Sequence, residues 1–107
     1  MATLYITEFA NLQDLPVATH AQIVAAPALV EQAIAISGSS AQSAAFNAQT
    51  RVIRVSSDGV CGWTVGTNPT ATAVSAGLGS PRLAIGVVEY IGIPQGQSYK
   101  IAGITTT

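Results

Sequence analysis

The sequence has very few charged residues. Asp, Glu, Lys and Arg make up 8% of its 107 residues, and the formal net charge is −1, whereas about 25% of the residues of a typical soluble domain are charged. Four basic residues cannot neutralise a row of phosphates, so no nucleic-acid partner is expected. Charge also keeps soluble monomers apart. Either Ser, Thr, Gln and Asn hydrate the surface, or other subunits cover much of it; we favour the second and expect a homo-oligomer.

Residues that carry chemistry are equally scarce. The one cysteine, Cys61, excludes an intramolecular disulfide and is expected to be a small buried hydrophobe. The one histidine, His20, falls short of the ligand set that a zinc or iron site needs, and we expect it to be solvated or locally hydrogen-bonded. Gly-x-Ser-x-Gly, Walker A and complete dinucleotide-binding patterns are absent. We therefore assign no catalytic, cofactor-binding or metal-binding residue, and we expect a protein that is not an enzyme and has no cofactor.

Long apolar runs are missing too. The most apolar stretch, from Leu83 to Ile93, is broken by Glu89 and is shorter than the ~20 residues that a transmembrane helix needs. The first residues, MATLYITEFANL, have no basic region and carry Glu8, unlike a signal peptide. We expect no membrane partner, and a protein made in the cytoplasm that stays soluble or enters an assembly there.

What the sequence does contain is a strong strand-and-turn signal, centred on Thr50 to Thr72 (TRVIRVSSDGVCGWTVGTNPTAT). A β-branched run is followed by Ser-Ser-Asp-Gly, which is turn chemistry, and then by a second alternating run that contains Trp63. The period of two places Cys61, Trp63 and Val65 on one face, expected to be the inner one. The stretch predicts two strands paired as a hairpin.

Further strands are predicted on both sides of this stretch. Residues 28–37 alternate apolar and polar side chains and predict a strand, although their Ala, Leu, Glu and Gln residues would equally suit a short helix. For residues 38–49, anchored by Phe46, we favour an extended edge and a turn over an Ala-rich helical turn, and residues 71–81 form a flexible loop. Residues 82–93, bent near Val87, and residues 98–104 are predicted to pair across a turn at Pro94. Six or seven short strands with regular turn signals indicate an all-β sandwich or a small barrel, and we predict a small antiparallel β-sandwich that is jelly-roll-like.

The N-terminal segment has two interpretations. Residues 3–9 (TLYITEF) alternate well, but both faces carry apolar groups, which suits either a first strand or an extended arm on a neighbouring molecule. We predict the arm, with residues 1–27 as an N-terminal arm and irregular segment and residues 28–107 as the sandwich domain. Leu4, Ile6 and Phe9 are then the expected interface anchors.

Two sets of side chains leave binding roles open. Trp63, Tyr5, Tyr90 and Tyr99 are candidates for a carbohydrate-stacking platform, although with so few aromatic residues core packing is favoured for Trp63. Arg51 and Arg54 lie three apart on a predicted strand and point to opposite faces. One of them is therefore a candidate for an interfacial salt bridge to another subunit, with a solvated strand residue as the alternative.

Residues 38 to 104 carry a pattern that resembles small structural proteins of tailed bacteriophages. It comprises a Ser-rich lead (SSAQSAAFNAQ), the strand RVIRV, the segment GTNPTA, a Gly/Ala loop and the closing strand GQSYKIAGI. The pattern covers about two-thirds of the chain, and the first 25 or so residues fall outside it. The resemblance implies a virion component, most plausibly one that decorates the head, and it carries no catalytic residue.

The resemblance and the composition together predict a capsid decoration (cement) protein. Such a protein would be made in the host cytoplasm, would bind the major capsid protein or other virion proteins, and would stabilise the assembled head, with a trimer as the expected oligomer. The alternatives are a neck, tail or fibre-base subunit of the virion, and a small carbohydrate-binding β-sandwich module.

Overall fold

The computed structural model of the chain describes residues 2–14, 20–24, 26–75 and 77–107, and for residues 12–14 and 20–24 it describes the backbone only. All regular structure in this part of the chain is β-strand. In chain order the strands are β1 (Ala2–Phe9), β2 (Leu12–Asp14), β3 (His20–Val24), β4 (Val30–Ile36), β5 (Ala41–Gln42), β6 (Val52–Ser57), β7 (Cys61–Gly66), β8 (Arg82–Leu83), β9 (Glu89–Gly92) and β10 (Lys100–Thr105). No helix within these ranges is long and apolar enough to cross a membrane.

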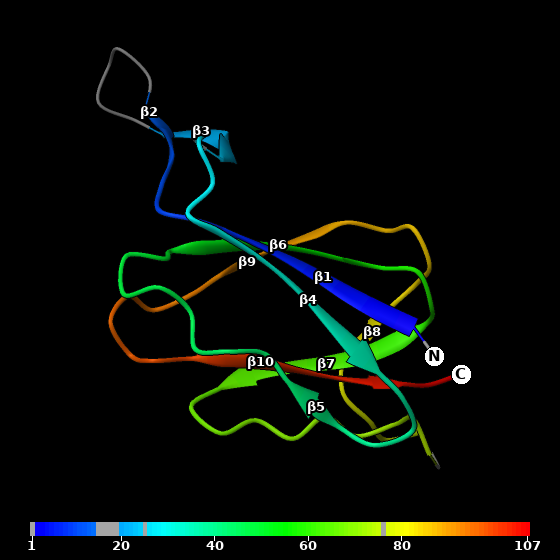
Figure 1. Cartoon of the computed structure of the whole chain (residues 1–107). Helices are drawn as coiled ribbons and strands as arrows, with labels where there is room; N and C mark the ends of the chain where they lie inside the picture. Colours follow the sequence, from blue (N-terminus) through cyan, green and yellow to red (C-terminus); the bar gives the residue numbers. More distant parts are fainter. Residues whose placement is uncertain (1, 15–19, 25, 76) are drawn as a thin grey trace.

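Eight of the strands form two facing antiparallel sheets. The first sheet has the order β4-β1-β6-β9 and the second has the order β5-β10-β7-β8. Strands β2 and β3 pair only with each other and project away from the sandwich (Figure 1). The predicted all-β fold, a small antiparallel β-sandwich, is confirmed. A jelly roll also has eight strands in two sheets.

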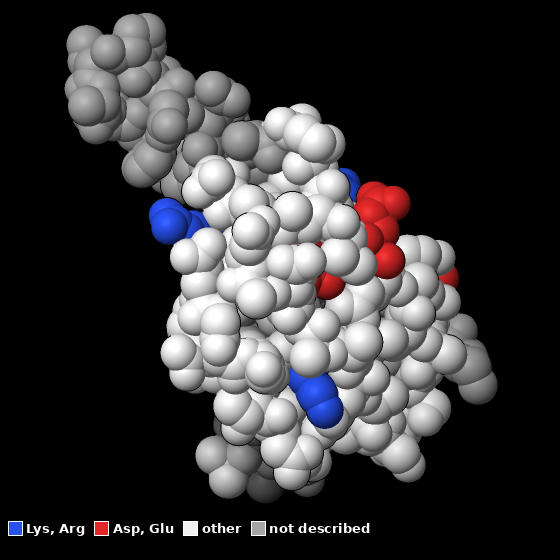
Figure 2. All heavy atoms as spheres, turned by 60° about the vertical axis from the view of Figure 1, so that its left-hand side comes forward, with Lys and Arg blue, Asp and Glu red and all other residues white. Residues whose placement is uncertain are grey.

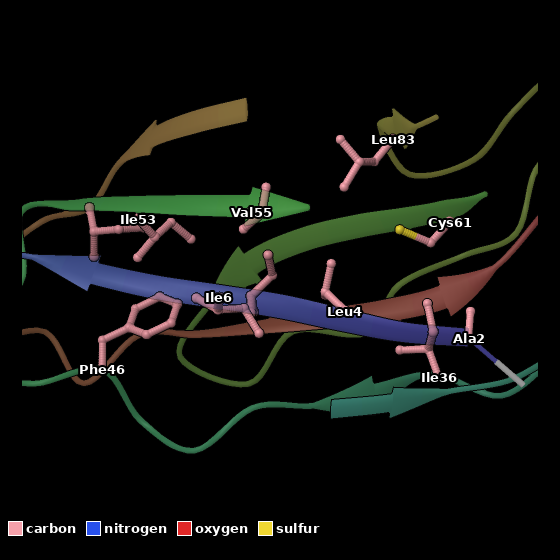
Figure 3. Close-up of a cluster of buried hydrophobic side chains, with 11 residues drawn as sticks. Ala2, Leu4, Ile6, Ile36, Phe46, Ile53, Val55, Cys61 and Leu83 are labelled. Atoms are coloured by element: carbon pink, nitrogen blue, oxygen red, sulfur yellow. The ribbon is translucent and has the colours of Figure 1, made fainter. Parts of the chain in front are cut away.

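The main core fills the space between the two sheets. Strand β1 buries Leu4 and Ile6, β6 buries Ile53 and Val55, and their side chains point toward the second sheet (Figure 3). The other buried members of this cluster are Ala2, Ile36, Phe46, Cys61, Leu83, Ile93 and Ile101. Each large aliphatic side chain buried in this way contributes roughly 1.5–3 kcal/mol of transfer free energy.

Glycine 103 lets the sheets approach closely at one point. Gly103 lies on the inner face of β10, opposite Trp63 of β7. A Cβ atom at this position would lie 3.0 Å from Cδ2 of Leu4 and 3.1 Å from Cγ2 of Ile36. Both neighbours are fully buried, so they have little room to move. The glycine in this strand is therefore a packing requirement.

Strand β10 is buried on both faces. Its inner face contributes Ile101 to the main core, while Ala102 and Ile104 form a second cluster on the outer face together with Ala71. This outer face is covered by residues 67–75 and 77–81, which we call the strap. Two hydrogen bonds fix the strap in place: Val74 N donates to Thr106 Oγ1 (2.9 Å), and Ala71 N donates to Ser40 Oγ (2.9 Å). The sequence predicts a flexible loop here, but the described residues form a covering layer instead.

The strands predicted around the Ser-Ser-Asp-Gly turn exist, but they do not pair with each other. Strand β6 lies in the first sheet and β7 in the second, so the segment between them crosses from one sheet to the other. The predicted hairpin is wrong because the same turn residues serve a hairpin and an inter-sheet crossing. The crossing lets the apolar faces of β6 and β7 meet in the core. For the same reason β9 and β10, predicted to be partners across the Pro94 turn, lie in different sheets.

The predicted N-terminal arm is also wrong. Strand β1 is an interior strand of the first sheet, antiparallel to β4 on one side and to β6 on the other. Its alternation is as predicted, with Leu4, Ile6 and Glu8 on one face and Tyr5 and Thr7 on the other. The boundary at residue 27 therefore cuts through a single domain, and only the β2–β3 hairpin stands away from it (Figure 1).

Glutamate 8 is a fully buried carboxylate that fixes the loop leading into β6. Its Oε1 accepts hydrogen bonds from Asn47 N (2.7 Å) and Thr50 Oγ1 (2.8 Å), and its Oε2 accepts one from Gln32 Nε2 (2.9 Å). The Gln32 amide is itself held, because its Oε1 accepts from Ala44 N (2.9 Å). A buried carboxylate is tolerated only when such donors satisfy it. Glu8 thus joins β1, β4 and the loop before β6.

Candidate interaction surface

The outer face of the first sheet carries a row of polar side chains that crosses all four strands. Thr7 of β1 is paired with Glu31 of β4 on one side and with Arg54 of β6 on the other. Arg54 is in turn paired with Tyr90 of β9. Glu31 and Tyr90 are exposed, and Arg54 and Thr7 are half-buried. The Thr7 hydroxyl donates a long hydrogen bond of 3.5 Å to Glu31 Oε1.

The next row along the strands contains Ala33, Tyr5 and Ser56. Between the two rows lies an open hollow of about 390 Å³ on strands β4, β1 and β6. We call it the β1 hollow, and its outward-facing lining side chains are Tyr5, Thr7, Glu31, Ala33, Arg54 and Ser56. The hollow exists because small side chains occupy its floor, while Tyr5, Glu31 and Arg54 stand around them.

A patch of exposed apolar side chains adjoins the β1 hollow. Ile85, Val87, Val88 and Tyr90 are 62%, 44%, 39% and 58% exposed, and we call these four the loop patch. A second hollow, of about 440 Å³, lies where Ile85 and Val88 meet Tyr5 and Arg54. Tyr and Arg are enriched at protein–protein interfaces, whose fully buried centres are apolar. The composition of this region is therefore typical of an interface.

The loop patch is held in place by backbone contacts. Gly86 N donates to Ser57 O (3.2 Å), and Val87 N donates to Ala84 O (3.2 Å), which closes a tight turn. Gly86 has a φ of 74°, a conformation that costs other residues more than glycine. The exposed apolar groups therefore lie on an ordered turn next to β6.

The molecule as a whole carries few charges. On the side that Figure 2 shows, the acidic and basic side chains form small, separate groups and most of the surface is uncharged. Beside the loop patch, Arg54 and Asp58 line the second hollow.

The predicted interface anchors do not lie on this surface. Leu4 and Ile6 are 0% and 1% exposed and belong to the main core, and Phe9 is 8% exposed. A side chain buried in its own domain has no area left to bury against a partner, so the assignment of Leu4, Ile6 and Phe9 to an interface is wrong. The alternation in residues 3–9 gives the two faces of β1 correctly; the outward residues Tyr5 and Thr7 are the accessible ones.

The four aromatic residues considered for carbohydrate stacking do not share a face. Trp63 and Tyr99 are half-buried and pack against the main core. The Trp63 indole N–H is buried and makes no hydrogen bond to any described residue. Tyr5 and Tyr90 are exposed on the outer face of the first sheet. Of the two arginines, Arg54 faces the β1 hollow, while Arg51 is exposed just before β6 begins.

The described part of the chain holds no cluster of metal-binding side chains. No three His, Cys, Asp or Glu side chains lie close enough there to hold one metal ion. The prediction for the His20 side chain falls outside the residues whose side chains are described; in the backbone, His20 pairs with Asp14 at the start of β3.

Cys61 is fully buried in the main core, as predicted. Burial raises the pKa of its thiol above the ordinary value; a hydrogen bond with Ser57 lowers this pKa and the nearby Glu89 raises it further, but burial is the largest effect. We expect a thiol reagent to label the native protein about a hundredfold more slowly than the protein in denaturant, because the thiolate is the reactive form and is disfavoured here. Labelling followed by mass spectrometry from pH 7 to 9.5 measures this rate.

The same shift predicts a loss of stability at alkaline pH. The folded thiol keeps its proton to a higher pH than the unfolded thiol, so the free energy of unfolding should fall as the pH rises above about 8.5. A Cys61→Ala variant should lack this part of the pH dependence. Rapid labelling of the native wild-type protein at neutral pH would contradict both expectations.

No protein-family model matches the chain, and no curated protein or solved structure matches it either. The resemblance to phage structural proteins therefore depends on the residues and motifs of this sequence.

Proposed function

We propose that this protein is a non-enzymatic structural component of a tailed-phage virion, and that it decorates the assembled head and stabilises it. Two kinds of observation support the proposal. The sequence pattern of residues 38–104 resembles that of small phage structural proteins. The structure carries an ordered, exposed apolar patch next to Tyr5 and Arg54, on a molecule with little charge.

The loop patch is the single observation that carries the proposal. Its four apolar side chains are exposed, and Ile85 and Val88 share one hollow; these side chains lose their contact with water only if another molecule covers them. Each Å² of apolar area buried contributes about 25 cal/mol, so the patch alone gives weak binding. On a shell, the contacts of several linked subunits add up, and their joint affinity exceeds that of one subunit. The patch is therefore suited to binding a repetitive surface such as a capsid.

Replacing two residues of the loop patch should prevent head binding. We expect the Ile85→Ser/Val88→Ser variant to occupy heads at least about tenfold less than the wild type at equal protein concentration, because about half of the patch becomes polar. The measurement is co-sedimentation with heads assembled without this protein, from the phage that carries the sequence.

The strap offers a matched control. Val74 and Leu78 are 42% and 76% exposed and lie on the outer side of the second sheet. The Val74→Ser/Leu78→Ser variant changes similar side chains but should leave head binding unchanged. If this control loses binding and the loop-patch variant keeps it, the contact surface is the strap. If neither the wild type nor any variant binds heads, the decoration role is wrong.

Two other roles predict different outcomes. A neck, tail or fibre-base subunit would appear in electron micrographs of the virion as a ring of six or twelve copies at one vertex, and heads alone would not bind it. A carbohydrate-binding module is favoured by the exposure of Tyr5 and Tyr90. Glycan-array binding that is lost in Tyr90→Ala would support this role.

A further inference from the structure

We propose that the β1 hollow is a self-association surface, where a second copy of the chain packs face to face across a two-fold axis that runs along β1. This names the partner for the outer face of the first sheet, and it rests on the proposed role as a subunit of an assembly. The contact makes a dimer, in place of the trimer expected from the sequence. The argument comes from the charges on that face, from the small residues between them and from the position of the loop patch.

The two charged residues of the hollow lie on either side of β1. Glu31 and Arg54 belong to one cross-strand row with Thr7 between them. Neighbouring strands are ~4.8 Å apart, so the backbones of Glu31 and Arg54 are separated by about 10 Å, each one strand away from β1. A rotation of 180° about an axis parallel to β1, in the plane between two copies, places Glu31 of each copy over Arg54 of the other.

The charges select this axis over its alternative. A two-fold axis perpendicular to the strands, through the same row, would place Glu31 opposite Glu31 and Arg54 opposite Arg54. Like charges in direct contact disfavour an interface. The axis along β1 brings Glu31 and Arg54 of opposite copies together instead. This contact occurs twice, because every contact in an isologous interface has a symmetric counterpart.

The side chains near the axis fit a close approach of two sheets. Thr7 would face Thr7 of the second copy, and Ala33 would face Ser56, so only small groups meet beside the charged pairs. Packed sheets lie ~10 Å apart with their strands nearly aligned, a spacing that Glu and Arg side chains can bridge. Tyr5, 46% exposed, would contact its counterpart along the axis.

The proposed dimer contact adjoins the loop patch. Strands β4, β1 and β6 form the contact, and Ile85 and Val88 share the second hollow with Tyr5 and Arg54, which the contact uses. A second copy therefore covers part of the surface around the loop patch. A three-stranded face is smaller than the ~800 Å² per partner of a standard interface, so we expect a dissociation constant of about 10–100 μM.

Charge reversal tests the two-fold arrangement. Sedimentation equilibrium of the full chain should show a monomer–dimer equilibrium for the wild type. The dissociation constants of Glu31→Arg and of Arg54→Glu should be at least about tenfold higher, because each variant brings two pairs of like charges together in the dimer. The double variant should dimerise like the wild type. An equimolar mixture of the two single variants should also dimerise, because each Arg then faces a Glu.

The controls separate charge from folding. Arg82→Glu makes the same change on β8 of the second sheet, where the side chain is exposed, and should leave dimerisation unchanged. All variants should keep the near-ultraviolet circular dichroism spectrum of the wild type, since Glu31 and Arg82 are exposed and the half-buried Arg54 does not belong to the buried core. A wild type that stays monomeric at about 1 mM, or single variants that dimerise as the wild type does, would overturn the inference.

Head binding is measured separately, so the two proposals can fail independently. A dimer that does not bind heads contradicts decoration and leaves the self-association surface in place. A monomer that binds heads contradicts the self-association surface and leaves decoration in place.

Discussion

Deleting the strand Ala2–Phe9 is expected to leave a chain that does not fold. The deletion removes an interior strand of the first sheet, so β4 and β6 lose their hydrogen-bonding partner. It also removes Leu4 and Ile6 from the main core and Glu8 from the loop before β6. The total stability of a domain is only about 5–15 kcal/mol. Far-ultraviolet circular dichroism and the one-dimensional proton spectrum of the truncated chain measure the outcome.

Two single substitutions on neighbouring residues also test whether β1 belongs to the folded domain. Leu4→Ala should reduce the free energy of unfolding by about 2–5 kcal/mol, because Leu4 is fully buried between the sheets. Tyr5→Ala, one residue along the same strand, should cost far less, since Tyr5 is 46% exposed on the outer face. Urea unfolding followed by Trp63 fluorescence measures both. If the truncated chain folds and Leu4→Ala is harmless, β1 is an arm after all.

Glu8→Ala is expected to destabilise the protein by about 4 kcal/mol. The substitution leaves three donors, Asn47 N, Thr50 Oγ1 and Gln32 Nε2, without the acceptor that holds them. A buried donor left unpaired costs about 1–3 kcal/mol. For a domain of this size the loss corresponds to a melting temperature about 15–30 °C lower. Thermal unfolding followed by circular dichroism measures it.

Glu8→Gln separates hydrogen bonding from packing. The amide has nearly the same shape, and its oxygen can still accept from Asn47 N and Thr50 Oγ1. Its NH₂ group would then meet Gln32 Nε2, which is also a donor, so we expect a loss of about 1–2 kcal/mol. Glu31→Ala removes an exposed carboxylate on β4 and should change stability by less than about 0.5 kcal/mol. Equal losses for Glu8→Gln and Glu8→Ala would mean that charge, and not the number of acceptors, determines the effect.

Local alternation predicts several strands and their faces, but the predicted strand 82–93 is wrong, because these residues divide into β8 and β9, which lie in different sheets. Alternation predicts the two faces of β1 and β4 and the inner face of β7, because each depends only on which residues alternate along one strand. The buried anchor Phe46 was predicted from its composition alone, as the one large apolar residue of a small, polar segment. Alternation does not say which strand lies beside which. Turns such as Ser-Ser-Asp-Gly permit a hairpin or a crossing between sheets, and the choice depends on the partners that each apolar face finds in the whole fold.

The candidate surface is harder to predict for the same reason. Tyr5 and Thr7 were identifiable as one face of β1, but the pairing of Thr7 with Glu31 and Arg54 is a property of the sheet register. The buried role of Glu8 was also hidden, because its donors come from segments 24 to 42 residues away in the chain. One signal was present in the sequence: a lone acidic residue on the apolar side of an otherwise regular strand.

Both ends of the described fold are interior strands, β1 in the first sheet and β10 in the second. During translation, therefore, the second sheet lacks an interior strand until the last one is made. The inner faces of β4 and β6 have no complete second sheet to pack against until residues 100–105 leave the ribosome, about 4–15 s after synthesis of β4 begins at ~5–20 residues per second. Chaperone binding to ribosome-held intermediates should persist until β10 emerges and then fall abruptly.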